Sequence, residues 1–455
     1  MKGKTSLFFC AAITILTVLF SPQSVADLSD QQIARLGNDL TPLGGERAGN
    51  AEGTIPEWTG GILSSPEGYQ IGEHHRDPFS EDPILFTIDS SNLENYRDNL
   101  TPGHQRMLES YSSFRMPVYP SRRSASAPER IYEATRLTAA TARLADDGNG
   151  VADAAIGIPF PIPENGLEII WNHLLRYRGD TINCEMGQAA VTAGGDFAIV
   201  KFLTQAEMRY WLPNMTADQL DNTMMYFKQK ITSPARLAGD ILLVHETMNQ
   251  VAEARRAWTY NPGQRRVRRA PNVAYDNPGT TSDGLRTSDQ FDMFNGAVDR
   301  YNWELVGKRE MFVPYNSYKL HSGQLAFSDL LTPLHPNPDH LRYELHRVWI
   351  VEATLKKGAS HLYPRRTFYV DEDSWQILLA DSYDARGELW RVSEGHVINY
   401  YENPLIWSTL EVHIDLQARR YLALGLDNEF NMCTWDEKPE SRDFSVAALR
   451  REGIR

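Results

Sequence analysis

The residues that could support catalysis are few, and no complete catalytic motif joins them. His245-Glu246-Thr247-Met248-Asn249 begins like the zinc-binding helix of metalloproteases, but Asn249 stands where the second histidine ligand is required. The flanking residues alternate as in a strand, whereas that motif needs a helix. The sequence contains no G-x-S-x-G nucleophile elbow, P-loop, G-x-G-x-x-G or C-x-x-C motif. We therefore expect a protein that is not an enzyme.

A second group of candidate ligands lies further along the chain. His335, His340, Glu344 and His346 are close together in sequence, and imidazole is a common metal ligand. Ordinary histidines of loops and strand surfaces are the simpler interpretation. We expect no metal site and no cofactor.

Six arginines fall on the two arms of one predicted hairpin around the turn Asn261-Pro262-Gly263-Gln264. They are Arg255, Arg256, Arg265, Arg266, Arg268 and Arg269. One interpretation is a solvated strand pair whose arginines meet nearby carboxylates. The other is a docking surface for an anionic partner, namely lipid headgroups, lipopolysaccharide or an acidic protein, with Arg265, Arg266, Arg268 and Arg269 as its candidates.

The overall charge makes this hairpin an exception. The 455 residues include 46 Lys+Arg and 59 Asp+Glu, for a net charge of −13, which argues against nucleic acid as a partner. A hydrophobic content of 42% is too high for a disordered chain. The 10 Trp, 20 Tyr and 17 Phe need a covered place in the fold.

Residues 1–26 have the pattern of a secretory signal peptide. Lys2 and Lys4 precede an apolar run, and small residues end at Ala26. Cleavage after Ala26 predicts an exported, periplasmic chain, with or without association with the outer membrane. No later stretch is long and apolar enough to span a membrane. Cys184 and Cys433 would remain, either as a disulfide or as two buried thiols.

The remaining chain divides into two parts by pattern. Frequent turn residues over 27–160 predict an irregular wrapping segment with helices over 93–111 and 129–144. Residues 161–455 predict an antiparallel β domain, which begins with a helix over 167–177 and contains a second helix over 216–227. The fold class is thus mainly β, α+β: one large curved sheet or half-barrel covered by helices. Residues 27–455 are expected to form one structural unit.

Alternation within the strands predicts an apolar face. In 410–416, Leu410, Val412 and Ile414 share one side, while Glu411 and His413 point to the other. If helices cover that face only in part, an apolar cavity remains for a lipid. The residues assigned to this cavity are Trp258, Tyr260, Trp349, Val351, Phe368, Val370, Leu410, Val412 and Ile414.

Several long motifs resemble a known proteobacterial family. Trp-Thr-Tyr-Asn-Pro-Gly-Gln-Arg-Arg-Val-Arg-Arg-Ala-Pro over 258–271 and Arg-Thr-Ser-Asp-Gln-Phe-Asp-Met-Phe over 286–294 are similar to domain of unknown function 1329. Ile158-Pro159-Phe160-Pro161 and Trp171-Asn172-His173-Leu174 match as well. The resemblance covers nearly all of the chain beyond the leader.

The resemblance implies an exported protein with no assigned catalytic residues. The hairpin is similar to that of the lipoprotein-localisation carriers of LolA/LolB type, which hold acyl chains in a cavity between a curved sheet and helices. This chain is longer, and its N-terminal segment has no counterpart there. Related genes often lie beside transporters of the resistance–nodulation–division superfamily, which suggests an envelope transporter or outer-membrane protein as partner.

Three hypotheses follow. The first is a periplasmic carrier or accessory protein that binds a lipid or other hydrophobic molecule and serves outer-membrane lipid or lipoprotein trafficking or such a transporter. The second is a structural subunit of an envelope transport complex without a ligand of its own. The third is an envelope hydrolase, for which His245, Glu246, Glu344 and His346 are the candidates.

Overall fold

The computed structural model describes residues 28–145, 148–270, 273, 275–435 and 441–454. The predicted signal peptide therefore lies outside the described residues. None of the helices in the described part of the chain is long and apolar enough to span a membrane.

Most of the strands belong to one sheet. Its strands are β1 (Phe86–Ile88), β2 (Met116–Val118), β5 (Thr181–Val191), β6 (Ile199–Glu207), β7 (Thr223–Ser233), β8 (Ile241–Thr247), β9 (Arg256–Asn261), β10 (Arg266–Arg269), β11 (Tyr301–Pro314), β12 (Tyr343–Leu355), β13 (Arg365–Asp371), β14 (Ile377–Tyr383), β15 (Leu389–Tyr400), β16 (Leu405–Asp415) and β17 (Arg420–Leu426). A separate hairpin joins β3 (Arg143–Ala145) to β4 (Gly150–Ala152).

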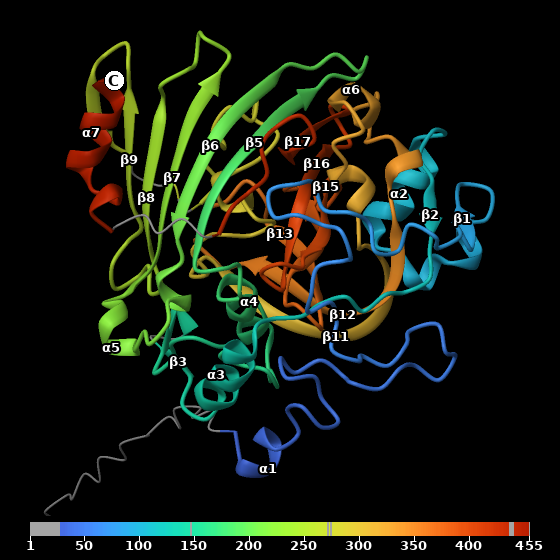
Figure 1. Ribbon diagram of the computed structural model, residues 1–455. Helices are drawn as coiled ribbons and strands as arrows, with labels where there is room; N and C mark the ends of the chain where they lie inside the picture. Colours follow the sequence, from blue (N-terminus) through green and yellow to red (C-terminus); the bar gives the residue numbers. More distant parts are fainter. Residues whose placement is uncertain (1–27, 146–147, 271–272, 274, 436–440, 455) are drawn as a thin grey trace, which may run out of the picture.

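The order of the sheet is β1-β2-β12-β13-β14-β15-β16-β17-β5-β6-β7-β8-β9-β10, with β11 on β12. Neighbouring strands are antiparallel, apart from a short parallel contact of β2 with β12. Figure 1 shows the sheet bending, so that β5 to β9 form one wall and β11 to β16 another. The prediction of a mainly β protein with one large curved sheet is confirmed.

The helices are short and lie around the sheet. They are α1 (Asp30–Ile33), α2 (Pro102–Ser110), α3 (Glu129–Ala139), α4 (Gly166–Leu174), α5 (Ala217–Leu220), α6 (Phe327–Leu330) and α7 (Val446–Ile454). Among the described residues the 3-10 turns are η1 (Leu93–Asn95), η2 (Arg97–Asn99), η4 (Arg209–Trp211), η5 (Ser288–Gln290), η6 (Tyr318–His321), η7 (Pro338–His340) and η8 (Ser441–Phe444).

One predicted helix is wrong. The capping box of Thr216 and Gln219 is present, but α5 ends after one turn. Asp221 and Asn222 adopt left-handed backbone angles, with φ of 45° and 58°, which stop a helix. The next residues pair with β6 and β8 as β7, because strand pairing across a buried face outweighs local helix propensity.

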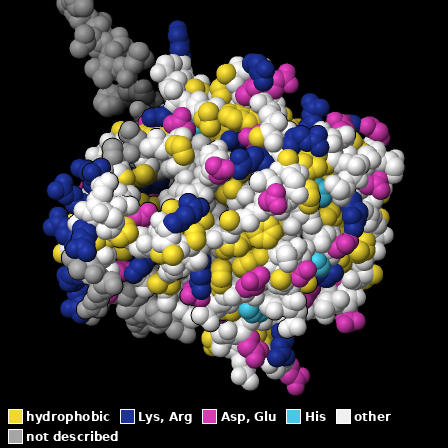
Figure 2. Space-filling model, turned by 90° about the horizontal axis from the view of Figure 1, so that it is seen from above, with side chains coloured by type: hydrophobic (Ala, Val, Ile, Leu, Met, Phe, Trp, Pro, Cys, Tyr) yellow, Lys and Arg dark blue, Asp and Glu magenta, His cyan; other side chains and the backbone are white. Residues whose placement is uncertain are grey.

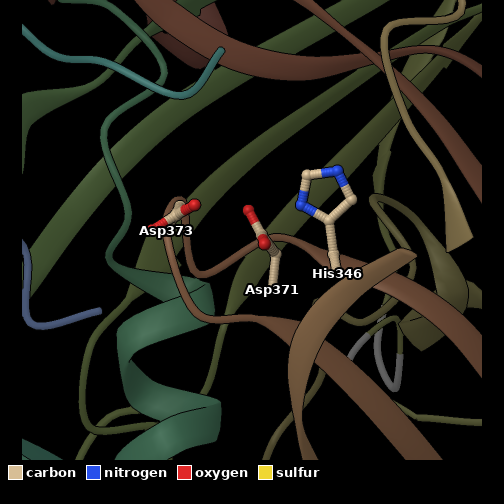
Figure 3. A group of neighbouring side chains, drawn as sticks. All are labelled: His346, Asp371 and Asp373. Carbon is tan, nitrogen blue, oxygen red and sulfur yellow. The ribbon is translucent and has the colours of Figure 1, made fainter. Parts of the chain in front are cut away.

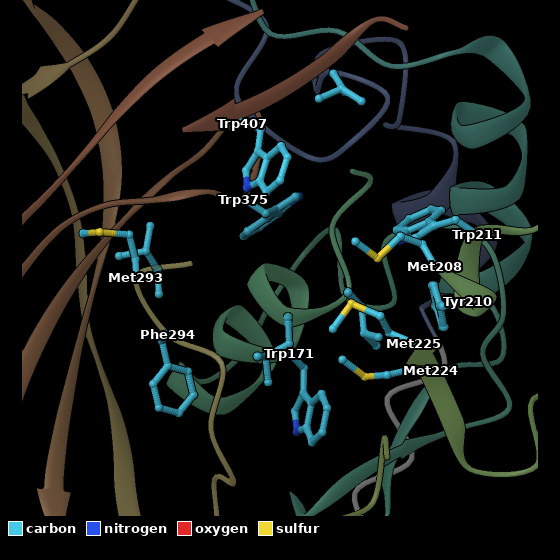
Figure 4. Packing of buried hydrophobic residues seen from close by; sticks show 14 of the residues in the cluster. Trp171, Met208, Tyr210, Trp211, Met224, Met225, Met293, Phe294, Trp375 and Trp407 are labelled. Atoms are coloured by element: carbon cyan, nitrogen blue, oxygen red, sulfur yellow. The ribbon is translucent and has the colours of Figure 1, made fainter. Parts of the chain in front are cut away.

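Two large apolar clusters cover the sheet on opposite faces. The first contains Trp171 of α4 together with Trp375 and Trp407, and Figure 4 shows these rings packed among methionines. The second contains Met107 and Leu108 of α2 with residues of β15 to β17. The aromatic side chains that the composition left unplaced thus fill both faces, and β1 and β2 of the N-terminal segment join the sheet itself.

The two remaining cysteines are joined. Cys184 of β5 forms a disulfide with Cys433, and the backbone of Asn183 pairs with that of Thr434 beside it. The link fastens the segment that leads to the C-terminal helix to the strand in the middle of the sheet. Of the two alternatives left open by the sequence, the structure contains the disulfide.

Candidate functional site

A hollow lies against β7, β8 and β9, under the segment 277–295. It has a volume of about 220 Å³, and its apolar walls include Met225, Phe227, Leu242, Val244 and Phe291. A second hollow of about 280 Å³ shares four lining residues with it, namely Gln229, Leu242, Thr259 and Thr280. The two hollows adjoin at these residues and are hereafter named together the β7–β9 cavity. Their combined volume is in the range of small-molecule sites.

Strand alternation builds the floor of this cavity. Phe227 is paired with Val244, and Leu242 is paired with both Gln229 and Thr259, so these side chains project from one face. The intervening residues point the other way. Leu243 and Tyr260 pack against Leu449 of α7 on that opposite face.

One end of the cavity is closed by a buried ion pair. Arg255 and Glu246 lie 2.7 Å apart and are almost fully buried. Arg255 also donates to the carbonyl oxygens of Val273 and Asn295, at 2.7 and 2.6 Å. The pair is satisfied internally, so it ties the roof segment to the floor.

A second buried arginine in the wall lacks a carboxylate partner among the described residues. Arg286 is 6% exposed, and its Nε has no hydrogen-bond partner in the described structure. Nη1 donates to the carbonyl of Thr287 at 3.3 Å. Burial lowers the pKa of this guanidinium, because the charged form is poorly solvated there.

Gly279 allows this arrangement. A Cβ at that position would lie 2.9 Å from Cζ of Arg286, so a larger residue there would displace the guanidinium. The backbone N–H of Gly279 donates to the carbonyl of Arg286 at 2.8 Å and closes the roof hairpin. The carboxyl groups of Glu411 and Asp289 act on Arg286 from beyond ion-pair distance, and an anionic group entering the cavity would give it a direct partner.

The predicted docking arginines lie on the edge strand next to this cavity. Arg265, Arg266, Arg268 and Arg269 are all exposed, and none pairs with a described carboxylate. Figure 2 shows Lys and Arg side chains gathered along the flank where β9, β10 and α7 lie. Arg255 and Arg256 differ, because they pair with Glu246 and Glu253.

The nine residues predicted to line one cavity do not come together. Val351, Phe368 and Val370, with Trp349 packed against them, belong to the cluster around α4. Leu410, Val412 and Ile414 belong to the cluster around α2 on the opposite face. Trp258 and Tyr260 pack in the small cluster under α7, where Tyr260 also reaches the edge of the second hollow.

The physical reason is that both faces of the sheet are covered. Alternation within one strand fixes which residues share a side of that strand, but not which side of the sheet this is. Register shifts, such as those between Tyr369 and Val370 and between His396 and Val397, then change the parity from strand to strand.

The four candidates for hydrolysis do not converge either. Glu246 is bound to Arg255, and the neighbouring His245 is bonded to the carbonyl of Phe444 at 2.7 Å on the α7 face. Glu344 and His346 lie 3.0 Å apart on β12, in the other wall. The cavity walls were not predicted from the sequence, because Met225 and Phe227 fell within a predicted helix. The alternating pattern Leu242-x-Val244-x-Glu246 was the signal that could have located one of the strands.

Comparisons with known proteins agree with the resemblance noted in the sequence. The model of the family described as "Protein of unknown function (DUF1329)" matches residues 87–450. An uncharacterized protein of Pseudomonas aeruginosa is 47% identical over 439 residues, which is 96% of each chain.

Solved structures share parts of the architecture at low sequence identity. A putative outer membrane lipoprotein-sorting protein domain from Vibrio parahaemolyticus has a TM-score of 0.44 at 14% identity, covering 63% of this chain and 98% of that one. A DUF1329 family protein from Desulfovibrio piger has a TM-score of 0.42 at 17% identity, covering 60% and 92%. A LolA superfamily protein from Nitrosomonas europaea has a TM-score of 0.38 at 12% identity, covering 63% and 100%.

Proposed function

This chain belongs to the DUF1329 family of proteins of unknown function, and we propose that it is a non-catalytic periplasmic carrier that binds an anionic amphiphile in the β7–β9 cavity. The acyl part of the ligand lies along Phe227, Leu242 and Val244, and its acidic head meets Arg286. The observation that carries this proposal is a buried guanidinium without a carboxylate partner among the described residues, in the wall of an apolar cavity.

The energetic argument combines two terms. Each methylene moved from water into the cavity contributes about 0.8 kcal/mol. A charge-assisted hydrogen bond to Arg286 adds about 1.5–3 kcal/mol, because the guanidinium is desolvated before the ligand arrives. A simple fatty acid or the acidic head of a larger lipid would provide both.

The exposed arginines of β10 provide the delivery surface in this proposal. Arg266 and Arg268 are exposed on the edge strand and lack described acidic partners, so they are free to meet anionic phospholipids. The export signal over 1–26, and service to outer-membrane lipid or lipoprotein trafficking or to an envelope transporter, belong to the same proposal.

The test is binding of a fluorescent fatty acid to the purified chain. We expect one saturable site, with affinity reduced at least about 10-fold by Leu242→Trp, which fills the point shared by the two hollows. Leu137→Trp, at a residue of α3 that is 74% exposed, is the matched control and leaves the affinity unchanged.

Arg286→Met separates the head from the chain of the ligand. It weakens binding of the acid about 10-fold and that of its methyl ester much less, because the ester carries no charge. Equal effects on both compounds would contradict the role of Arg286. Absence of any saturable binding would instead favour a ligand-free subunit of an envelope complex.

A further inference from the structure

Three acidic or imidazole side chains meet in the other wall, far along the sheet from the β7–β9 cavity. His346 lies on β12, Asp371 ends β13, and Asp373 is in the turn that follows. One ligand atom from each lies within 4.8 Å of the other two, and all three residues are buried. In Figure 3 the Asp371 carboxylate lies between Asp373 and the His346 ring, which turns a nitrogen toward it.

Asp371 presents an unused oxygen to this group. Its Oδ2 accepts from the hydroxyl of Tyr315 at 3.0 Å and from the backbone and side chain of Ser374 at 3.0 and 2.5 Å. Its Oδ1 is buried and has no hydrogen-bond partner in the described structure. The residue itself is fully buried, so this oxygen has lost its water without a described replacement.

The neighbouring carboxylates are neutralised by bases, but Asp371 is not. Asp373 receives Nε and Nη2 of Arg123 at 2.8 and 2.6 Å. Glu372 pairs with Lys308 at 2.8 Å and with Arg347 at 3.1 Å. No described Lys or Arg pairs with Asp371, so its negative charge needs either a bound proton or a bound cation.

His346 is oriented as a metal ligand is. Its Nε2 is 3.0 Å from Oε2 of Glu344, which fixes the ring and leaves Nδ1 as the second nitrogen. A carboxylate on the far nitrogen is the usual support of a metal-bound histidine. Glu344 is itself held by Arg342 at 2.6 Å, Asn316 at 3.0 Å and the backbone N–H of Arg122 at 2.6 Å.

We propose that His346, Asp371 and Asp373 bind a divalent transition-metal ion, which fastens the N-terminal segment to the sheet. One imidazole and two carboxylates form the mixed nitrogen and oxygen set that suits Zn²⁺ or Mn²⁺, whereas Ca²⁺ and Mg²⁺ prefer oxygen ligands alone. Sequence spacing did not reveal this group, because Asp371 and Asp373 are 25 or more positions from His346 and meet it only through the pairing of β12 with β13.

The segment fastened in this way is the one around Gly45. A Cβ on Gly45 would lie 2.7 Å from Oδ1 of Asp373, and the N–H of Glu46 donates to Glu372 at 3.2 Å. Arg123 bridges the carbonyl of Glu46, at 2.6 Å, and Asp373. A metal ion holding Asp373 therefore stabilises this contact as well.

The test is a Zn²⁺ titration of chelator-stripped full-length protein against a chromophoric competitor, repeated with Mn²⁺. We expect one equivalent per chain and a higher melting temperature on binding. Asp371→Asn and His346→Gln lower the affinity for Zn²⁺ at least about 100-fold, and Glu344→Gln lowers it about 10- to 100-fold through the supporting hydrogen bond.

Asp381→Asn is the matched control. Asp381 is another fully buried carboxylate with an unpartnered Oδ1, but it lies on β14 outside the group. Its amide variant keeps the Zn²⁺ affinity of the unchanged protein. If a ligand variant does not fold, the visible absorption of Co²⁺ bound to the unchanged protein reports its ligands independently.

Two results would overturn the proposal. One is the lack of stoichiometric Zn²⁺ or Mn²⁺ binding, which would mean that a proton on Asp371 balances the charge. The other is binding that survives both Asp371→Asn and His346→Gln, which would place the metal elsewhere. Neither result bears on the β7–β9 cavity, so this proposal and the carrier proposal fail independently.

Discussion

The two walls of the sheet solve the same burial problem in different ways. In the wall of β12 to β16, apolar clusters cover both faces, and arginines such as Arg366 and Arg391 are buried against Asp289 and Asp415. In the wall that begins at β5, one face borders the β7–β9 cavity, Arg286 lacks a carboxylate partner among the described residues, and the edge arginines of β10 face solvent. The first wall has its apolar faces covered and these arginines paired, whereas the second has an unpaired arginine and apolar surface left for an amphiphile.

The largest expected contrast comes from removing one charge in each setting. Asp292 pairs with Arg176 and with Arg178, all buried. Asp292→Ala leaves two guanidinium groups uncompensated and lowers the free energy of unfolding by about 3–5 kcal/mol. Arg286→Ala leaves no described carboxylate unpaired and costs about 1 kcal/mol. Chemical denaturation of both variants checks this, and equal losses would remove the distinction between a paired and an unpaired buried charge.

The disulfide ties β5, the first strand of the cavity wall, to the segment before the C-terminal helix, and its loss should be the next largest effect. Replacing Cys184 and Cys433 by Ser frees a closure of 249 residues and lowers the free energy of unfolding by about 2–4 kcal/mol. The double variant should still bind the fluorescent fatty acid below its melting transition. An unchanged free energy of unfolding in chemical denaturation would show that the disulfide does not stabilise the folded state.

The filled wall should also show a pH dependence, to which one buried carboxyl on β14 contributes. Burial raises the pKa of Asp381 to about 6, despite hydrogen bonds from the Gly103 N–H and the Tyr369 hydroxyl. The folded state therefore holds this proton more tightly than the unfolded state, whose carboxyl has a pKa near 3.9.

The sign follows from that difference. The stabilisation by protonated Asp381 is complete below about pH 4 and is lost as the pH rises through about 6, by about 2–3 kcal/mol. Asp381→Asn has the shape of a protonated carboxyl but does not titrate, so the free energy of unfolding should change less between pH 4 and 6. A variant with the same slope as the unchanged protein would assign the effect to other groups.

The smallest effect concerns the edge arginines. Arg266→Ser with Arg268→Ser should weaken binding to vesicles containing phosphatidylglycerol by about 2 kcal/mol, at about 1 kcal/mol for each charge. Arg115→Ser with Arg386→Ser removes the same charge from arginines that pair with Asp339 and Asp384. Co-sedimentation with vesicles compares the two double variants. Equal weakening would indicate an effect of net charge alone. If the partner is an acidic protein instead, neither the variants nor the unchanged protein should bind the vesicles.

Strand alternation and turn residues predicted the sheet well, because those signals are local. The hairpin around Asn261-Pro262-Gly263-Gln264 formed as expected between β9 and β10. The position of the cavity was not predictable in this way. Leu410 and Val351 look alike in sequence, but they lie under different covers on opposite faces.

The chemistry of both proposed sites depends on contacts between distant segments. The fold brings the carboxylate of Asp289 into an ion pair with Arg366 and brings no described carboxylate that close to Arg286, and no spacing in the sequence encodes that difference. His346 and Asp371 become neighbours through strand pairing, so their short-range context suggested an ordinary strand histidine. The exposed arginines could be predicted, because an edge hairpin with six arginines cannot bury them all.

Native mass spectrometry of the freshly purified protein, with lipid extraction of the same sample, tests the central claim most directly. We expect one acidic amphiphile per chain, which is released on denaturation. The Leu242→Trp variant should lack this molecule, and the Leu137→Trp variant should retain it. A chain that carries no such molecule and binds no fluorescent fatty acid, or one whose bound lipid survives Leu242→Trp unchanged, would contradict a carrier built around the β7–β9 cavity.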